Sequence, residues 1–296
     1  MLTTTLFRQF IGLPLCCALL VPSAVVGDGD RVVVIDRAEE SPIDALVAEP
    51  DLYAHPERGF GVTLPRSLGA RKLIFVIDHR ALNRISDKPA ASFLGFDRGV
   101  KISLGLRYGI GDFLDAGIIR SSDPVDPFDT YELDARMQLL KEHRHVIDCA
   151  ISGGADWFYQ ESRDDASGYF GRVMIGRSFL RRVYAGAGFL VHSNSTWSGK
   201  RVDHDDHSMG IPVLVNGRFF DWLSVLYEGC FPVAGYRAGV ASWAAGLKLS
   251  TFRHTFALLV SNSKYVTADG LVSGSDRAGR PAAAFSITRI FDFNTR

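Results

Sequence analysis

Apolar residues recur at every second position along most of the chain. The clearest stretch is 100–110, VKISLGLRYGI, where six apolar residues alternate with five polar or glycine residues. A helix would spread these six around its surface, whereas a β-strand places all of them on one face. The same alternation is found over 131–139 and 183–191. The pattern therefore predicts a chain built mainly of strands.

Weaker forms of the pattern predict nine further strands. They lie at 72–81, 112–121, 145–154, 168–176, 210–219, 222–231, 239–249, 254–262 and 282–293. Most have the length that a tilted strand needs to cross a bilayer, and they exceed the five or six residues usual in soluble sheets. We expect an all-β fold, a transmembrane antiparallel up-and-down β-barrel of about 12 strands, with 10 or 14 as alternatives.

The connections between these strands alternate in length. The long ones are 82–97, 122–130, 155–167, 192–209, 232–238 and 263–281, and the short ones are 109–112, 141–144, 177–182, 220–221 and 250–253. A membrane barrel has long loops at one rim and short turns at the other, and an even strand count places both chain ends at the short-turn, periplasmic rim. A soluble exported β-sandwich, the alternative, has no reason to keep this rhythm.

The N-terminal part differs from the rest. Residues 1–27 combine Arg8, an apolar run and a small-residue end, which predicts a secretory signal peptide and export to the outer membrane. Residues 28–70 contain four prolines and lack the alternation, so we expect a periplasmic N-terminal extension or a plug in the lumen, followed by the barrel over 71–296. Outside the signal, Cys149 and Cys230 face opposite sides of non-neighbouring predicted strands, so no disulfide is expected.

Composition narrows the class of protein further. Basic and acidic residues balance at 33 each, which excludes a strongly basic nucleic-acid-binding protein. A hydrophobic share of 47% with 20 phenylalanines excludes a disordered chain. Only the first 27 residues approach the apolar run that a membrane-spanning helix needs. The balanced charge is therefore compatible with a membrane protein only if its hydrophobicity lies on one face of each strand.

The polar positions of the predicted strands face the lumen. The candidates are Lys101, Arg107, Glu132, Asp134, Arg136, Arg218, Glu228 and Lys248. They line a polar conduit for a small hydrophilic solute, or else they form an internal salt-bridge network that closes the lumen. Because both signs occur in similar numbers, we expect no strong ion preference.

Aromatic residues gather at the ends of the predicted strands. Phe219, Phe220, Trp222, Phe252, Phe291 and Phe293 fall at the periplasmic ends, and Trp157, Phe158 and Tyr159 fall at the opposite ends. Such girdles mark the two membrane interfaces of a barrel. They predict contact with outer-membrane lipid, and Trp197 and Lys200 in the long loop 192–209 are candidates for contact with lipopolysaccharide headgroups.

Other polar residues are candidates for the rim or loops: His79, Arg80, Asp206 and His207. The run His204, Asp205, Asp206 and His207 is a weak metal-site candidate, but solvated loop polarity explains it better because no second ligand cluster accompanies it. A general base at His79 would need a neighbouring nucleophile, and the chain has neither a Gly-x-Ser-x-Gly nor a His-Glu-x-x-His motif. We expect no cofactor, no metal and no catalytic residues.

Seven short segments stand in the order found in a known family. They are FVIDHR at 75–80, LGFD at 94–97, LGLRYG at 104–109, IRSS at 119–122, DH at 206–207, HTFALLVSN at 254–262 and SITRIF at 286–291. Over residues 59–293 the chain resembles uncharacterised bacterial outer-membrane β-barrel proteins with a domain of unknown function. The resemblance implies an outer-membrane barrel and no established activity.

The chain departs from this resemblance in two places. Ala81 and Leu82 stand where an aromatic residue and a glycine are expected, and Asn294, Thr295 and Arg296 follow the final aromatic Phe293. The second departure bears on recognition by the barrel assembly machinery, an expected partner. For function we expect porin-like passage or binding of a small solute. The alternatives are an outer-membrane lipid-acting hydrolase and a closed structural or docking barrel for a partner complex.

Overall fold

The protein is described from a computed structural model. It describes residues 58–83, 85, 96, 99–122, 129–159, 166–179, 182–193, 196–197, 200–201, 207–278 and 280–294. The predicted signal peptide and residues 28–57 of the predicted extension lie outside this part, as do His204, Asp205 and Asp206. No helix of the described residues is long and apolar enough to cross a membrane.

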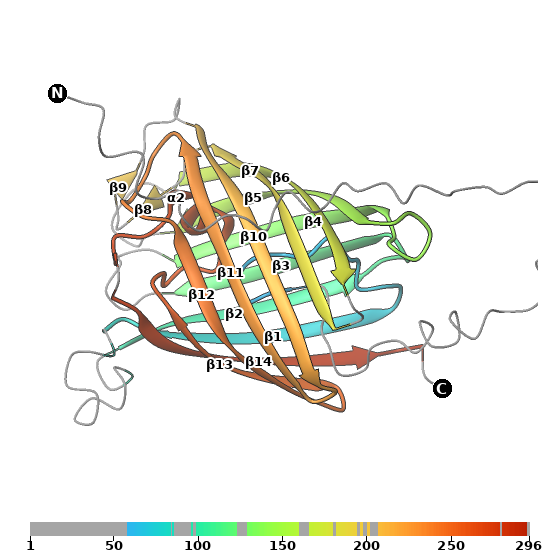
Figure 1. The fold of residues 1–296 in the computed structure, drawn as a ribbon. Coiled ribbons are helices and arrows are strands. Elements are labelled where there is room, and N and C mark those ends of the chain that lie inside the picture. Colours follow the sequence, from blue (N-terminus) through green and yellow to red (C-terminus); the bar gives the residue numbers. More distant parts are fainter. Residues whose placement is uncertain are drawn as a thin grey trace, which may run out of the picture. The chain divides into compact units, whose positions relative to one another are not determined.

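Twelve strands of the described residues close into one antiparallel barrel (Figure 1). Each strand pairs with its neighbours in the ring, and β14 closes the ring on β1 in a continuous register from Lys72↔Asp292 to Arg80↔Ala284. The strands are β1 (Lys72–Ala81), β2 (Val100–Gly109), β3 (Leu114–Ser122), β4 (Asp129–Leu140), β5 (Asp148–Tyr159), β6 (Ala166–Phe179), β7 (Val183–Ser193), β10 (His207–Phe220), β11 (Leu223–Ala234), β12 (Ser242–Thr251), β13 (His254–Ser261) and β14 (Ala282–Asp292). The predicted twelve-stranded antiparallel barrel is confirmed.

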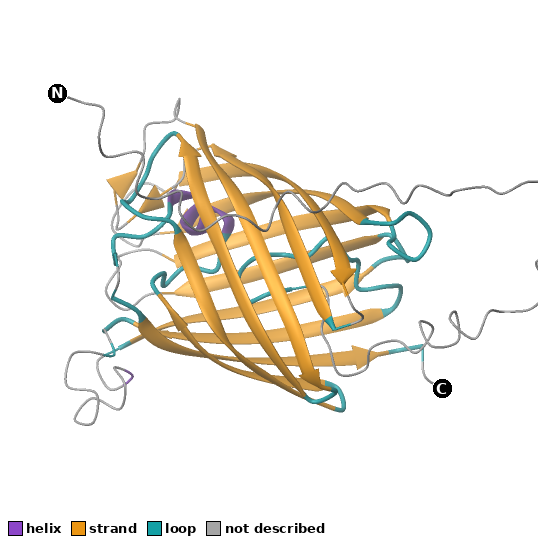
Figure 2. Ribbon diagram, in the orientation of Figure 1, coloured by secondary structure: helices purple, strands orange, loops and turns teal. Residues whose placement is uncertain are grey.

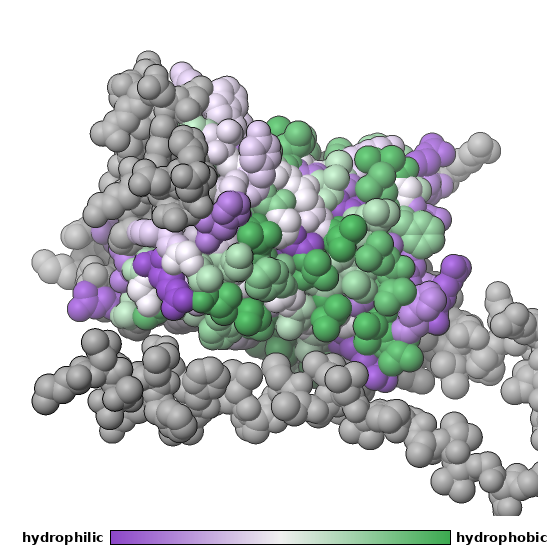
Figure 3. Space-filling model, turned by 90° about the horizontal axis from the view of Figure 1, so that it is seen from above, coloured by the Kyte–Doolittle hydropathy of each residue, from purple (hydrophilic) through white to green (hydrophobic). Residues whose placement is uncertain are grey.

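Alternation along each strand separates an inner face from an outer one. In β4, Glu132, Asp134 and Arg136 are buried inside the barrel, whereas Leu133 is 61% exposed and Met137 44% exposed on the outside. Figure 3 shows hydrophobic side chains gathered over the strands on one face of the barrel, with hydrophilic ones toward its ends. The apolar surface therefore lies outside the barrel and the charged surface inside it.

The two rims differ as the loop lengths predict. We call the end with connections such as 110–113, 221–222 and 252–253 the short-turn rim, and the opposite end the long-loop rim. Several strands extend further toward the long-loop rim than the sequence predicts: β5 continues to Tyr159 and β10 begins at His207. At this rim lies a small two-stranded sheet, formed by β8 (Thr196–Trp197) and β9 (Lys200–Arg201).

The β13–β14 connection folds inward at the long-loop rim. Its helix α2 (Ala268–Ser273) has all six residues buried and contacts β6, β7, β10, β11 and β12. Figure 2 shows this helix enclosed by the strands near one end of the barrel. We call residues 262–278, which contain α2, the lid. The strand pattern predicts only a long loop here, because a buried helix of six residues leaves no period-two signal.

Residues 58–70, which precede β1, also lie in the lumen, and we call them the inner segment. Arg58 and Thr63 form an antiparallel bridge, and the N–H of Gly59 donates to the carbonyl of Val62 (2.8 Å), so the segment begins with a tight turn. Phe60 and Val62 are almost fully buried and pack in one cluster with Leu214 and other inward-facing side chains. The chain then runs to the short-turn rim, where β1 starts.

The aromatic side chains follow the expected girdles with one exception. At the short-turn rim, Phe219, Phe220, Trp222, Phe252 and Phe293 are exposed on the outside, and Phe291 is partly exposed. At the long-loop end, Trp157 and Tyr159 are exposed, but Phe158 is only 1% exposed. The assignment of Phe158 to the outer girdle was wrong, because β5 continues through this position and alternation turns every second residue inward.

Both cysteines of the described part are free thiols. Cys149 lies on the outer face of β5 and Cys230 on the inner face of β11, and these strands are not neighbours in the barrel. This is the geometry that the strand pattern predicts.

Candidate functional site

The candidate site is the barrel lumen, and its short-turn half holds a network of ion pairs. The guanidinium of Arg107 donates to the carboxylates of Asp115 and Asp134, and that of Arg136 donates to Asp115 (2.8 Å). Asp115 and Arg136 are almost fully buried. Because opposite charges face one another at close range, the network satisfies groups that would be costly to bury alone.

Sequence reasoning named Arg107, Asp134 and Arg136 but missed Asp115. The alternation of apolar and polar residues around Asp115 is weak, yet Asp115, Gly117 and Ser121 all lie on the inward face of β3. The register pairs Asp115 with Arg136 on β4, which brings the two charges together. The signal that could have identified Asp115 is therefore its phase relative to the apolar outer residues of the same strand.

The inner segment is held by side chains from several walls of the lumen. Glu228 on β11 accepts hydrogen bonds from the backbone N–H groups of Phe60 (2.7 Å) and Val62 (3.1 Å). Arg136 on β4 donates to the carbonyl of Leu64 (2.8 Å). Two predicted lumen residues, Glu228 and Arg136, thus bind backbone groups of the inner segment, which the strand pattern could not indicate.

Arg66 anchors the part of the inner segment that lies in the short-turn half of the lumen. It pairs with Asp148 (2.6 Å) and Glu142 (2.9 Å), and its guanidinium lies over the ring of Tyr184 at 4.5 Å from the centroid. Burial works against the charge on Arg66, but the negative charges of its partners, above all Asp148, outweigh it and raise the pKa of Arg66 above its ordinary value. Arg66 therefore stays positively charged and tied to the wall of the short-turn half.

The remaining lumen candidates lie apart from this network. Lys101 is buried with its ammonium 5.0 Å from the ring centroid of Tyr265 in the lid. Lys248 donates to the carbonyl of Arg58 (3.3 Å). Arg218 is half-buried near the short-turn end of β10, where its N–H donates to the carbonyl of Arg182 (2.7 Å).

The long-loop half of the lumen holds the lid. Glu132 on β4 accepts a hydrogen bond from the N–H of Ala268 at the start of α2 (2.6 Å). Close to the helix, Nε2 of His192 and Oδ2 of Asp156 form a hydrogen bond of 2.7 Å, and both side chains are fully buried. Sequence reasoning missed Asp156 and His192 because it ended the fifth and seventh strands before them.

The rim candidates His79 and Arg80 point to opposite faces of β1. His79 lies on the outer face, where its ring stacks on Phe285 with centroids 4.4 Å apart, rather than serving as a rim hydrogen-bonding residue. Arg80 points inward, is 4% exposed, and donates to the carbonyl of Ser263 (3.1 Å) in the lid. Adjacent residues of a strand cannot share a face, so the pair does not form one site.

His207 is exposed at the first position of β10, at the long-loop rim. Its predicted neighbours in the weak metal site, His204, Asp205 and Asp206, lie outside the described residues. Within the described part of the chain, no group of three or more His, Cys, Asp or Glu side chains is placed to hold a metal ion.

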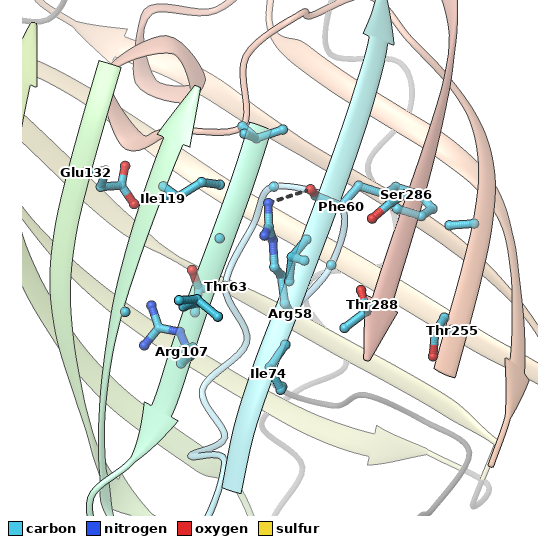
Figure 4. Close-up of a pocket in the computed structure, with 18 of the residues that line it drawn as sticks. Arg58, Phe60, Thr63, Ile74, Arg107, Ile119, Glu132, Thr255, Ser286 and Thr288 are labelled. Carbon is cyan, nitrogen blue, oxygen red and sulfur yellow. Dashed lines mark hydrogen bonds between the residues drawn. The ribbon is translucent and has the colours of Figure 1, made fainter. Parts of the chain in front are cut away.

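A small cavity remains between the inner segment and the wall. Its volume is about 70 Å³, enough for a few water molecules. Charges of both signs line it, namely Arg58, Arg107, Glu132, Asp134 and Lys248, together with hydroxyl groups such as those of Thr63, Thr255, Ser286 and Thr288. Figure 4 shows Arg58, Phe60 and Thr63 between the strands that carry Arg107 and Glu132 on one side and those that carry Ser286, Thr288 and Thr255 on the other.

A closed ring of strands with an apolar outside and a charged inside defines a membrane β-barrel. The model of one family, described as a membrane bound beta barrel domain (DUF5777), matches residues 65–291. The chain belongs to this family, whose function is unknown, and the resemblance read from its sequence is confirmed. A comparison with curated proteins found no match.

Solved structures with similar folds include several membrane barrels. The NanC porin is 8% identical with a TM-score of 0.46, covering 74% of this chain and 98% of the porin. Outer membrane phospholipase A from Escherichia coli is 11% identical with a TM-score of 0.41, covering 74% and 92%. LpxR from Salmonella typhimurium is 10% identical with a TM-score of 0.39, covering 75% and 100%.

Proposed function

We propose that this protein is an outer-membrane barrel that passes or binds a small hydrophilic solute, and that the described form is closed. The observation that carries the proposal is the polar attachment of the inner segment. Glu228, Arg136 and Arg66 hold it through hydrogen bonds and ion pairs to groups that water can also satisfy. Phe60 and Val62 add buried apolar contacts to these bonds. The segment takes no part in the strand pairing of the ring, so it can leave the lumen without opening the barrel wall.

The lining of the cavity indicates the kind of solute. Arg107 and Lys248 stand near Glu132 and Asp134, so neither sign dominates the wall. A ring of one sign would favour ions of the other sign. A neutral or zwitterionic solute therefore suits this lumen better than a strongly charged one.

The orientation follows from the rims. With the long-loop rim outward, the lid faces the cell exterior and the inner segment faces the periplasm, as in other barrels with long outer loops. The exposed rings of Trp157 and Tyr159 then lie at the outer interface, where they would contact lipopolysaccharide and lipid. Export by the predicted signal peptide at 1–27 and insertion by the barrel assembly machinery belong to the same proposal.

Conductance in planar bilayers tests the proposal. The unmodified protein should open rarely, whereas the double variant Glu228→Ala and Arg66→Ala, which loosens the inner segment, should give frequent steps with weak ion selectivity. Arg289→Ala is a matched control, because Arg289 is an exposed outer residue whose guanidinium lies over Phe291. If neither protein gives steps and neither binds a zwitterionic solute, the closed structural or docking barrel replaces this function.

The lipid-hydrolase alternative gains no specific support from the described residues. His79 stacks on Phe285, and His207 is an exposed residue at the start of β10. A nucleophilic mechanism needs a hydroxyl or thiol hydrogen-bonded to the base, and the described contacts of these two histidines include none.

A further inference from the structure

The lid and the inner segment touch each other inside the lumen. A β-carbon added to Gly61 would stand 3.4 Å from Cδ2 of Leu271 and 3.5 Å from the Cα of Val266. These distances correspond to tight or ordinary van der Waals contact. The turn of the inner segment therefore packs directly beneath the lid, with no layer of wall residues between them.

Arg80 binds both parts with one guanidinium. It donates to the carbonyl of Ser263 in the lid (3.1 Å) and to the carbonyl of Phe60 in the inner segment (3.4 Å). It also donates to the hydroxyl of Ser261 at the end of β13 (3.1 Å). If either part left, this buried cation would lose an acceptor, and an unsatisfied buried charge is costly.

A second connection lies across the barrel, on β6. Arg172 donates to the hydroxyl of Thr63 in the inner segment, and Thr63 lines the same small cavity as Glu132 on β4. Glu132 in turn accepts the N–H of Ala268 in the lid. Since β1 and β6 stand on nearly opposite sides of the ring, the inner segment is bound to the wall on both sides of the lumen.

We propose that the lid and the inner segment form one interlocked closure, so that loosening either part loosens the other. A displacement of the lid at the long-loop rim thereby loosens the inner segment, which runs to the short-turn rim. Coupling of this kind is reciprocal, because the same free energy links the two equilibria. A role of this interlock in regulating passage rests on the proposed function. The test below measures how firmly the two parts are held and not conductance, so the interlock and the proposed function can fail separately.

A disulfide that locks the lid provides the first test. Val240 and Ser275 form an antiparallel bridge with two backbone hydrogen bonds of 2.9 and 2.8 Å. Such pairs have Cα atoms about 5.5 Å apart, within the range of a disulfide. Val240→Cys and Ser275→Cys are placed in a full chain whose four native cysteines, Cys16, Cys17, Cys149 and Cys230, are replaced by alanine. Hydrogen exchange of residues 58–64 is then followed by mass spectrometry in detergent, before and after reduction.

Coupling predicts that the inner segment exchanges about fivefold or more slowly while the lid is locked. Adding Arg80→Met to the locked protein should shrink this difference, because the shared guanidinium is gone. If locking slows exchange in the lid but leaves residues 58–64 unchanged, the two closures are independent and the proposal is overturned.

The reverse experiment perturbs the inner segment and observes the lid. Gly61→Val pushes a branched side chain against Glu228, which holds the inner segment, and against Leu271 in the lid. Gly217→Val is the matched control, because a β-carbon there has no heavy atom within 4 Å. Exchange in the lid should rise about fivefold or more in the first variant and stay unchanged in the second. Equal rates of hydrogen exchange in the lid of both variants would contradict the interlock. This result would count even if the disulfide of the first test had distorted the lid.

Discussion

The two halves of the lumen satisfy their charges differently. In the short-turn half, Asp115 lies between the guanidinium groups of Arg107 and Arg136, and all three charges are paired. In the long-loop half, Oδ1 of Asp156 and Nδ1 of His192 have no hydrogen-bond partner among the described residues. Asp134 of the short-turn network likewise has one oxygen, Oδ2, without a partner among the described residues. The two halves therefore differ in the kind of bond they use, because hydrogen bonds between opposite charges are about twice as strong as neutral ones. We therefore expect the short-turn half, which holds the inner segment, to be rigid, and the long-loop half, which holds the lid, to be displaced more easily.

The largest effect is expected when a substitution breaks the ion-pair network of the short-turn half. Arg136→Met leaves Asp115 with one guanidinium partner and removes the donor to Leu64, and loss of one partner of a buried pair costs about 3–5 kcal/mol. Urea unfolding of the refolded barrel in lipid vesicles, followed by tryptophan fluorescence, measures this cost. Arg289→Met, at an exposed outer position, is the control. A cost near that of the control would show that the short-turn half is not the rigid one.

An intermediate effect is expected from a charge placed on the outer face. Leu133 lies between Glu132 and Asp134 but is exposed on the opposite side of the wall. Leu133→Arg should cost up to about 2–4 kcal/mol in vesicles, because a cation that faces lipid is poorly solvated and the cost rises with its depth in the bilayer. The same unfolding assay applies, with Leu133→Ile as the apolar control. Equal stability of the two variants would contradict the assignment of this face to lipid.

The smallest effect is expected in the long-loop half. Asp156→Asn keeps the shape of the side chain and weakens its bond to His192, so we expect a loss of about 1 kcal/mol. The same variant should speed hydrogen exchange in the lid more than in the short-turn half. A destabilisation as large as that of Arg136→Met would remove the difference between the two halves.

Strand order, strand number and the two faces could be predicted from the sequence because alternation is a local property. Lys101, Glu132 and Glu228 are buried inside the barrel as their phase indicates. The prediction failed where the alternation was interrupted. Gly153 and Gly154 precede the end of β5, and ending the strand there left Asp156 and Phe158 in a loop.

The sequence by itself determined a membrane barrel with an apolar outside, a charged inside and unequal rims. Only the tertiary structure decided what the inward charges do. Glu228 binds the backbone of Phe60, which lies 168 positions earlier, and Arg80 joins Phe60 to Ser263. Such partners depend on closure of the ring, on strand register and on two segments without periodicity. A period-two pattern assigns a side chain to a face, but it carries no information about which distant backbone group will meet it there.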